Sequence, residues 1–520
     1  RRYFRLRSDW LKNLNLGFHD LGAGTPFREP LSCREGSTVK GSCTDSINSA
    51  NLRLRLEPVV NLSETIKVKA QIDVLDNVVF GSTPDGTFYD GTASSANVPA
   101  AAFSGGQVAP EAGRNHVYDS IRAKRAWAEV TTPLGLLKFG RMPSHWGLGI
   151  LANAGGEDSF HGTTCTDCDF GDTADRIFFG TKIPGTDFMA AIARDWAGSG
   201  VSAAQTDIWR NRYDGQPWDL DDADDVTQWI FVVARLDKPE QWKTKIDDGE
   251  LAVNYGAYVV RREQSLDARG SMLDSAAAET TLSPRGAEAW IPDLYLRLGY
   301  HKLSFEAEGV VVYGSIDDLS DVSAGVVNQD IRQLGGVGRL SYLMLDDELD
   351  VGLEIGYASG DQWDATRPGE VNVRDSVVVP SETQAATGND STIRNFRFDF
   401  DYQVDLILFR ELLGAVTNAT YLKPRFTYSI SDRIALQGQA IVSFANVSVA
   451  TPGNGNMYGV ELDADLGYRN VDEGFFAGIS YGVLFPLGAL DHPAALFPGI
   501  GESGSAEAAQ TIQSRLVLTF

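Results

Sequence analysis

The stretch 121–149, IRAKRAWAEVTTPLGLLKFGRMPSHWGLG, contains two strand-length runs that meet at the tetrapeptide TPLG, residues 132–135. Proline and glycine at these positions are typical of a tight turn. In the first run apolar residues alternate with charged or aromatic ones: Ala126, Ala128 and Val130 against Arg125, Trp127 and Glu129. A period of two predicts a β-strand with one apolar and one charged face. The stretch is therefore predicted to form a β-hairpin, with strands over 119–148.

Amphipathic strand pairs of this kind recur along the whole chain. In 49–60, for example, Leu52, Leu54 and Leu56 alternate with Arg53 and Arg55. Besides the hairpin, the predicted strands lie at 3–16, 49–60, 66–80, 175–183, 187–197, 226–236, 250–263, 289–300, 302–315, 330–345, 348–359, 419–430, 434–446, 457–469, 474–487 and 509–520. Short turns and long polar connections alternate consistently between them. Such regularity is typical of transmembrane β-barrels of the bacterial outer membrane.

The predicted fold class is all-β, with a single domain over 1–520. It is a transmembrane antiparallel up-and-down β-barrel of about 18 strands, with about 16 or about 20 strands as the alternatives. We expect long extracellular loops and short periplasmic turns.

The composition is compatible with this fold and argues against other classes of protein. The net charge is −25, so nucleic acid, which selects basic surfaces, is not an expected partner. The chain has no run of about 18 apolar residues, so a helical membrane span is not expected. The first residues, RRYFRLRSDW, already show the strand pattern, and we expect any export signal to be absent from this numbering.

The four cysteines fall in two close pairs within polar stretches, Cys33 with Cys43 and Cys165 with Cys168. In an exported protein, an even number at short spacing predicts disulfides. The CxxC motif of the second pair is also compatible with redox chemistry, or with zinc near His161. It has no second thiolate pair and no βαβ context, however. Two disulfides that restrain extracellular loops are therefore the favoured interpretation.

The charged face of each strand is expected to line the interior, because side chains that face lipid must be apolar. The predicted pore-lining residues are Arg5, Arg7, Arg53, Arg55, Lys67, Lys69, Arg125, Glu306, Glu308, Asp350 and Glu354. Two interpretations stay open. Either neighbouring charges neutralise one another in a packed, plugged interior, or a basic wall faces an acidic wall across water and orients dipolar solutes. Like charges on neighbouring strands favour the second.

The segment 360–418 is a long extracellular insertion, and long connections in compact proteins tend to be functional. Within it Leu406, Phe409 and Leu413 have near-helical spacing, which predicts a short helix over 404–416. The apolar side chains of such a helix are expected to be buried in the lumen, against a neighbouring barrel or against a partner protein. The lumen is nearest, so we expect the helix to fold toward it. A further strand pair over 391–413 is the alternative.

Three segments carry a resemblance to known proteins. The hairpin AWAEVTTPLGLLKFGRMPSHWGLG, 126–149, resembles the strand–turn–strand of porins and of alginate-export-type barrels. With YFRLRSDWLKNLNLG, 3–17, and DYQVDLILFRELLGAVTNATYLKP, 401–424, it is closer to a family of myxobacterial outer-membrane barrels of uncharacterised function. The resemblance implies a multi-pass protein of the Gram-negative outer membrane, and no substrate. The strand 511–520 is similar to the signal that such barrels present to the outer-membrane assembly machinery.

The predicted function is a porin-like channel, not an enzyme, through which small polar solutes diffuse passively. The six histidines are scattered, and no Ser/His/Asp spacing or phosphate-binding loop is present. A structural or adhesive barrel whose loops bind partners is the alternative, and a barrel enzyme is less favoured. Expected partners are outer-membrane lipid and solutes, with a homo-oligomer or a plug protein as further candidates.

No cofactor is expected. Calcium is a weak candidate ligand for the acidic run Asp219, Asp221, Asp222, Asp224 and Asp225, because Ca²⁺ prefers oxygen ligands. The run lacks the EF-hand pattern and is more typical of a solvated loop.

Overall fold

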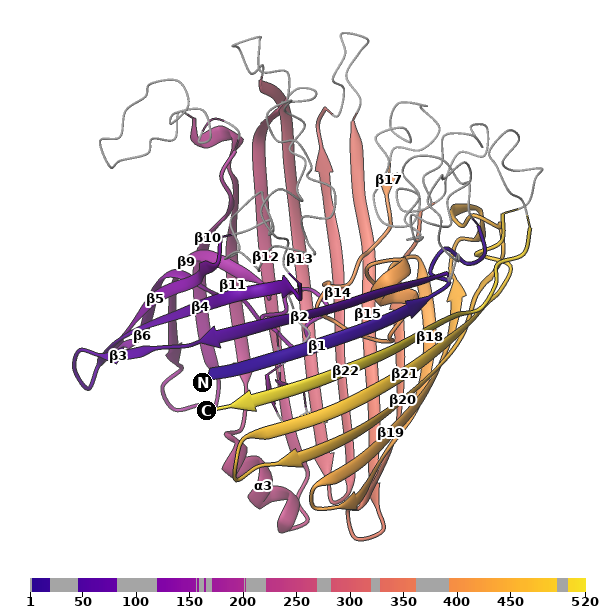
Figure 1. Cartoon of the computed structure of the whole chain (residues 1–520). Helices are drawn as coiled ribbons and strands as arrows, with labels where there is room; N and C mark the ends of the chain where they lie inside the picture. The colour runs from indigo at the N-terminus through magenta and orange to yellow at the C-terminus, as the bar shows by residue number, and fades with distance from the viewer. Residues whose placement is uncertain are drawn as a thin grey trace, which may run out of the picture.

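The computed structural model describes residues 2–18, 45–81, 119–155, 157–158, 163–164, 171–200, 202, 221–268, 282–318, 328–361, 392–492 and 504–520. They form one large barrel, with the two chain ends side by side in its wall (Figure 1). Both cysteine pairs and Asp219 lie outside the described residues, so the disulfides stay a prediction.

Each strand of the wall pairs antiparallel with the strands before and after it. The first half consists of β1 (Arg2–Lys12), β2 (Ser46–Leu56), β4 (Ile66–Val79), β5 (Ile121–Thr132), β6 (Gly135–Pro143), β9 (Thr173–Lys182), β10 (Met189–Gly198), β11 (Val226–Arg235) and β12 (Ala252–Ala268). The second half consists of β13 (Leu282–Tyr300), β14 (Leu303–Ile316), β15 (Gln329–Met344), β16 (Leu349–Ala358), β18 (Ala419–Ser431), β19 (Ile434–Ala445), β20 (Met457–Asn470), β21 (Phe475–Pro486) and β22 (Ala509–Thr519).

The wall closes where β22 pairs with β1, with Leu516 opposite Leu6. Within the described residues the main sheet has 20 strands. Two of them are short additions, β3 (Val59–Asn61) beside β4 and β17 (Thr392–Ile393) beside one end of β15, so 18 strands form the barrel. The predicted fold class and strand number are confirmed, and the two alternative numbers are wrong. A separate pair, β7 (Glu157–Asp158) and β8 (Thr163–Thr164), follows β6.

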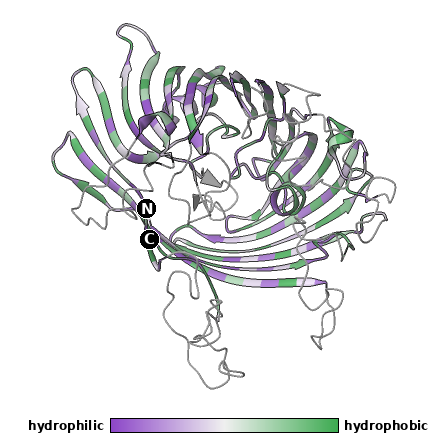
Figure 2. Ribbon diagram, turned by 90° about the horizontal axis from the view of Figure 1, so that it is seen from above, coloured by the Kyte–Doolittle hydropathy of each residue, from purple (hydrophilic) through white to green (hydrophobic). Residues whose placement is uncertain are grey.

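Side chains alternate between the two faces of each strand, as the sequence pattern predicts. On β1, Arg5, Arg7 and Asp9 are buried inside, whereas Phe4 is exposed outside. Exposed apolar side chains cover the outer face around the wall, among them Phe139, Ile177, Ile192, Phe231, Leu294, Val311, Leu340, Leu353, Leu422, Leu462, Ile479 and Leu516. The alternation is visible from above as short green and purple segments along the strands (Figure 2). An apolar exterior on a closed sheet is what a lipid bilayer requires.

Aromatic side chains mark the two borders of this apolar surface. Tyr255, Tyr300 and Tyr342 are exposed near the short-turn end of their strands. Trp229 and Tyr313 are exposed toward the opposite end of theirs. Aromatic girdles at both membrane–water interfaces are a regular feature of transmembrane barrels. The two sets of rings therefore indicate where the headgroup regions of the bilayer lie.

Replacing Leu353 by arginine is expected to destabilise the barrel. Leu353 is exposed on the outer face midway along β16, opposite Leu340 of β15 and Pro424 of β18. Arginine costs about 2–4 kcal/mol at the bilayer midplane and about 0–1 kcal/mol near the interface. The free energy of unfolding in lipid vesicles should therefore fall far more for Leu353→Arg than for Tyr357→Arg, nearer the end of the strand. Equal losses at the two positions would contradict the assigned outer face.

The short connections lie together at one end of the barrel, for example at 133–134 and 301–302. The connection between β11 and β12 contains an α-helix, α3 (Pro239–Asp247), which the sequence analysis did not predict. The Trp242 ring of this helix lies 4.4 Å from the guanidinium carbon of Arg297. At Gly299 a Cβ would come within 2.6 Å of the same ring, so this glycine leaves the space that Trp242 occupies. In the described part of the chain, no helix combines the length and the apolar character needed to cross a membrane.

Two segments that are not part of the wall supply much of the buried apolar core. The first inserted segment, 144–155, follows β6, and the second inserted segment, 394–418, precedes β18. Their buried residues Ile150, Phe396, Phe398, Tyr402, Leu408 and Phe409 belong to the same core cluster as inward residues of the wall. The coil of the second segment is drawn in orange near β14 and β15 (Figure 1).

Candidate functional site

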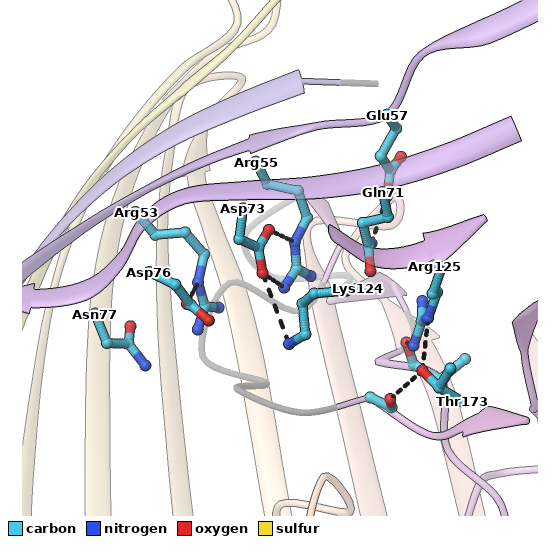
Figure 3. Close-up of polar contacts among 12 residues, drawn as sticks. Arg53, Arg55, Glu57, Gln71, Asp73, Asp76, Asn77, Lys124, Arg125 and Thr173 are labelled. Carbon is cyan, nitrogen blue, oxygen red and sulfur yellow. Dashed lines mark hydrogen bonds and ion pairs between the residues drawn. The ribbon is translucent and has the colours of Figure 1, made fainter. Parts of the chain in front are cut away.

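The predicted basic residues of β2 lie inside the barrel, each beside an acidic residue of β4. Arg53 is fully buried, and its Nε lies 2.5 Å from Asp76 Oδ1. Arg55 donates from Nε and Nη2 to the two carboxylate oxygens of Asp73, at 2.6 and 2.8 Å. Lys124 of β5 reaches the same carboxylate at 3.6 Å (Figure 3). These three cations and two carboxylates form a compact cluster on one side of the interior.

Two predicted basic residues of β1 are also buried among polar partners. Arg5 Nη2 donates to Asn51 Oδ1 at 2.9 Å. Arg7 Nε lies 2.6 Å from Asp9 Oδ2 on the same strand. Inward polar residues of β1 and β2 therefore continue the charged surface from strand to strand.

The three remaining predicted basic residues differ in their surroundings. Arg125 is buried and donates from Nε to Thr173 Oγ1 at 3.0 Å, which ties β5 to the start of β9. Lys69 Nζ lies 3.0 Å from Glu129 Oε2, and both side chains are partly exposed. Lys67 is exposed near the turn that precedes β4. The structure thus brings Arg125 toward the Arg55 cluster, but not Lys67.

The predicted acidic residues are paired with basic residues of neighbouring strands. Three pairs have short contacts: Glu306 with Arg297 at 2.9 Å, Asp350 with Arg425 at 3.4 Å, and Glu354 with Arg339 at 2.6 Å. The charges of these three acids are therefore balanced by arginines on neighbouring strands, as the first of the two interpretations predicts. A field across the lumen stays a prediction. The predicted pore-lining set did not include Asp76, Arg297 or Arg339. Asp76 is out of phase with Asp73, because the pairing of β4 with β2 shifts register between them.

The first inserted segment begins where the predicted strand was expected to continue. Pro143 ends β6, and the chain then turns away from the wall instead of extending to 148. The Glu308 carboxylate accepts hydrogen bonds from the backbone N–H groups of Leu148, Gly149 and Ile150, the last two at 2.9 and 3.3 Å. Glu308 thus does not stand free in the lumen, because it holds this turn against β14.

Trp146 fixes the same segment to the adjacent strand. Its Nε1 donates to Asp293 Oδ1 of β13 at 3.1 Å. Its ring stacks on Tyr258 of β12, with centroids 5.4 Å apart. The segment is therefore attached to three consecutive strands, β12, β13 and β14.

The second inserted segment contains one turn of π-helix, η3 (Leu408–Leu412), where a helix over 404–416 was predicted. The Glu461 carboxylate of β20 accepts the N–H groups of Leu406, Ile407 and Leu408 at 3.0, 2.8 and 2.9 Å. Asp405 accepts the next N–H, that of Phe409, at 3.0 Å. Two carboxylates thus supply the partners that the first turn of a helix lacks. The apolar spacing predicted the position of the helical turn. The length of the turn, however, depends on the carboxylates of Asp405 and Glu461.

The second segment also packs against β15. The Arg339 Nη2 group donates to the Tyr402 hydroxyl at 2.8 Å, and the same arginine binds Glu354. At Gly335 a Cβ would collide with the Phe396 ring, so the glycine allows this ring to lie directly on the sheet. The second segment therefore contacts two separate strands of the wall, β15 and β20. Its buried side chains lie inside the barrel.

Two acids of the run that was a weak calcium candidate, Asp221 and Asp224, make protein contacts. Asp224 accepts hydrogen bonds from the N–H and the hydroxyl of Ser202, at 2.8 and 2.9 Å. Asp221 accepts the Ala223 N–H at 2.9 Å and caps a 3-10 turn, η2 (Asp222–Asp224). Among the residues that the structure describes, no group of three metal-binding side chains is close enough to hold a metal ion. Calcium binding stays a prediction.

A closed antiparallel sheet with an apolar exterior and a charged interior defines a transmembrane β-barrel of the outer-membrane type. No protein-family model matches the chain, and no curated protein matches it. Similar solved structures are those of outer-membrane porins.

OccK11 (OpdR) of Pseudomonas aeruginosa is 11% identical, with a TM-score of 0.47, over 100% of this chain and 95% of that one. A BenF-like porin from Pseudomonas fluorescens Pf-5 is 10% identical, with a TM-score of 0.46, over 100% and 98%. The outer-membrane protein OpdK of Pseudomonas aeruginosa is 10% identical, with a TM-score of 0.42, over 99% and 97%. Similarity this distant does not show what the present chain transports.

Proposed function

We propose that the protein is a porin-like channel of the bacterial outer membrane, through which small polar solutes diffuse passively. The observation that carries the proposal is the 18-strand closed wall with charged side chains inside and apolar side chains outside. Barrels of about 16–18 strands are wide enough to leave an aqueous channel. A charged interior surface is compatible with water and polar solutes, and the exterior with lipid.

The two inserted segments would narrow this channel. The first is held by Glu308 and Asp293, and the second by Glu461 and Arg339, so both extend inward from the wall. A second role as an adhesive barrel, the alternative from the sequence, would depend on loops that lie outside the described residues. The finer resemblances, to alginate-export-type barrels and to a myxobacterial family, stay predictions, as does recognition of β22 by the assembly machinery.

Purified protein in a planar lipid bilayer should give stable ion conductance. A barrel that assembles but stays silent would refute the channel and favour a structural or adhesive role. Heat-modifiable migration on gels distinguishes assembled from unfolded protein in both cases.

The cluster around Arg55 is expected to influence ion selectivity. Arg53, Arg55 and Lys124 carry three positive charges against the two carboxylates of Asp73 and Asp76, which leaves one in excess. Lys124→Gln should therefore shift the reversal potential in a salt gradient toward cation preference. Lys182→Gln, which removes a mostly exposed charge at the end of β9, is the matched control and should leave the reversal potential unchanged. The same shift in both variants would indicate an effect of overall charge.

A further inference from the structure

The outer surface of the wall carries charged side chains on β10, β12 and β13. Arg261 of β12 is the cross-strand neighbour of Trp229 on β11 and of Trp290 on β13. Trp229 is exposed on the outer face, and Arg261 therefore points outward with it. Every outward position of the fully described strands β18, β19, β20, β21 and β22, by contrast, is uncharged. Because a charge beside lipid tails costs free energy, this local cluster points to a local role.

Four outward side chains form the outer charged network: Arg194, Arg261, Glu263 and Glu288. Arg261 Nε lies 3.0 Å from Glu288 Oε1, and its Nη2 lies 3.3 Å from Glu263 Oε2. Arg194 Nη1 lies 3.5 Å from Glu263 Oε1, and its guanidinium carbon lies 5.2 Å from the centre of the Trp229 ring. The side chains of Arg261 and Glu288 are 36% and 48% exposed, so each keeps polar surface for a further partner. The network as a whole has no net charge.

An apolar groove of about 600 Å³ opens beside this network on the outside of the barrel. It is lined by Ile192, Trp229, Phe231, Arg261, Glu288 and Trp290. Phe231 is the cross-strand neighbour of Ile192, and both side chains are exposed. They lie two residues from Trp229 and Arg194 toward the short turns, so they form the part of the groove nearer the middle of the membrane. The groove is therefore apolar at one end and charged at the other.

The charged end of the groove lies at the border of the apolar surface. Exposed Trp229 and Tyr313 mark this border, and Trp290 is the cross-strand neighbour of Tyr313. Tryptophan and tyrosine are enriched where lipid headgroups begin. Glu288 lies two residues beyond Trp290 toward the long connections, opposite Glu263. The outer charged network is therefore at the level of the headgroups, whereas Phe231 is at the level of the acyl chains.

We propose that this groove binds a phospholipid with a zwitterionic headgroup, whose phosphate contacts Arg261 and whose amine contacts Glu288. A guanidinium group has several N–H donors in a fork that fits phosphate oxygens, and Arg261 uses only part of it for its carboxylate partners. A carboxylate accepts hydrogen bonds from an ammonium group. One acyl chain would then follow the groove past Phe231 and Ile192.

The balance of charge selects the class of headgroup. A phosphate and an amine together carry one charge of each sign, which complements a network that contains both signs and no excess. An anionic headgroup without an amine would meet the carboxylates of Glu263 and Glu288 as well as the arginines, and the repulsion would offset the attraction. The inference goes beyond the proposed channel function and does not depend on it, because the groove is on the outer face of the wall.

The test is native mass spectrometry of the barrel in detergent with equal amounts of dioleoyl phosphatidylethanolamine and dioleoyl phosphatidylglycerol. The two lipids share a phosphate and acyl chains, and only the first has an amine. The unmodified protein should retain phosphatidylethanolamine about fivefold more, a factor that corresponds to about 1 kcal/mol, the upper value for an exposed ion pair. The double variant Arg261→Gln, Glu288→Gln removes one charge of each sign and keeps the groove, and it should lose this preference.

The matched control is the double variant Asp330→Asn, Arg332→Gln. Arg332 is the cross-strand neighbour of exposed Tyr313 and pairs with Asp330 at 3.1 Å, so this is an outward ion pair of the same kind. It does not line the groove, and its removal should leave the preference unchanged. Heat-modifiable migration on gels shows whether each variant has assembled.

Four results would overturn the lipid site. These are equal retention of the two lipids by the unmodified protein, a preference for phosphatidylglycerol, a preference that survives in the Arg261→Gln, Glu288→Gln variant, and a dimer that carries no lipid. The last would mean that a second copy of the chain covers the groove. Lipid retention is measured without conductance. A barrel that retains phosphatidylethanolamine but never conducts would therefore refute the proposed channel and support the lipid site.

Discussion

Replacing residues 402–412 by a glycine–serine sequence of the same length is expected to raise single-channel conductance severalfold. These residues contribute no hydrogen bonds to the strand ladders of the wall, so the barrel should still assemble. Tyr402, Leu408 and Phe409 are almost fully buried inside it, and no equivalent apolar contacts would be possible for glycine and serine. The replaced segment should therefore leave the wall and free the space that it occupied.

A second variant, Gly335→Val, tests the same segment by a single change in the wall. A side chain at Gly335 would collide with Phe396, which lies at the other end of the second segment. This single change in the wall should loosen the segment without deleting it, and should give a smaller rise in conductance. Unchanged conductance in the replacement variant, together with loss of a multimer on native gels, would show that the segment is instead an interface between barrels.

Glu354→Ala is expected to cost about 1–3 kcal/mol of unfolding free energy, because it leaves the fully buried Tyr421 hydroxyl without its acceptor. Glu354 is 3% exposed, and it binds Arg339 at 2.6 Å and the Tyr421 hydroxyl at 2.5 Å. Arg339 in turn holds Tyr402, so the loss should also reach the second inserted segment. Denaturant titration in lipid vesicles measures the change.

Asp350→Ala on the same strand provides the comparison. Its pair with Arg425 is partly exposed, with a longer contact of 3.4 Å. Pairs in contact with water contribute about 0–1 kcal/mol, so this variant should remain close to the unmodified protein. A loss for Glu354→Ala as small as that for Asp350→Ala would mean that water reaches the Glu354 site.

The sequence predicted the wall well because a transmembrane barrel repeats one local rule. Each strand needs apolar residues toward lipid at every second position, so Phe4 and Arg5, or Leu54 and Arg55, already reveal the two faces. The short turns then mark where each strand reverses. An even number of such strands brings the two ends of the chain to the same side of the membrane.

The inside of the barrel was less predictable, because contacts there join residues that are distant in sequence. Nothing near Glu308 indicates that it binds the backbone of 148–150, and nothing near Glu461 indicates its bonds to 406–408. The pattern predicts that the stretch PSHWGLG, 143–149, ends a strand, whereas the ladder already stops at Pro143. Helix α3 has too little apolar periodicity to stand out. Alternation tells which residues point inward, but not which of them meet.

The pairing of Leu6 with Leu516 has a consequence for the lifetime of the assembled protein. Each wall strand has a partner on both sides, so unfolding cannot begin by peeling a free edge and must break a complete ladder of hydrogen bonds first. Bringing such distant residues together makes folding slow, since the entropy of closing a long loop is lost before the contacts form. The same barrier slows the reverse reaction. Once closed, the barrel should therefore persist for kinetic reasons, with a half-life set by the rate of opening at one seam and not by the balance of folded and unfolded states.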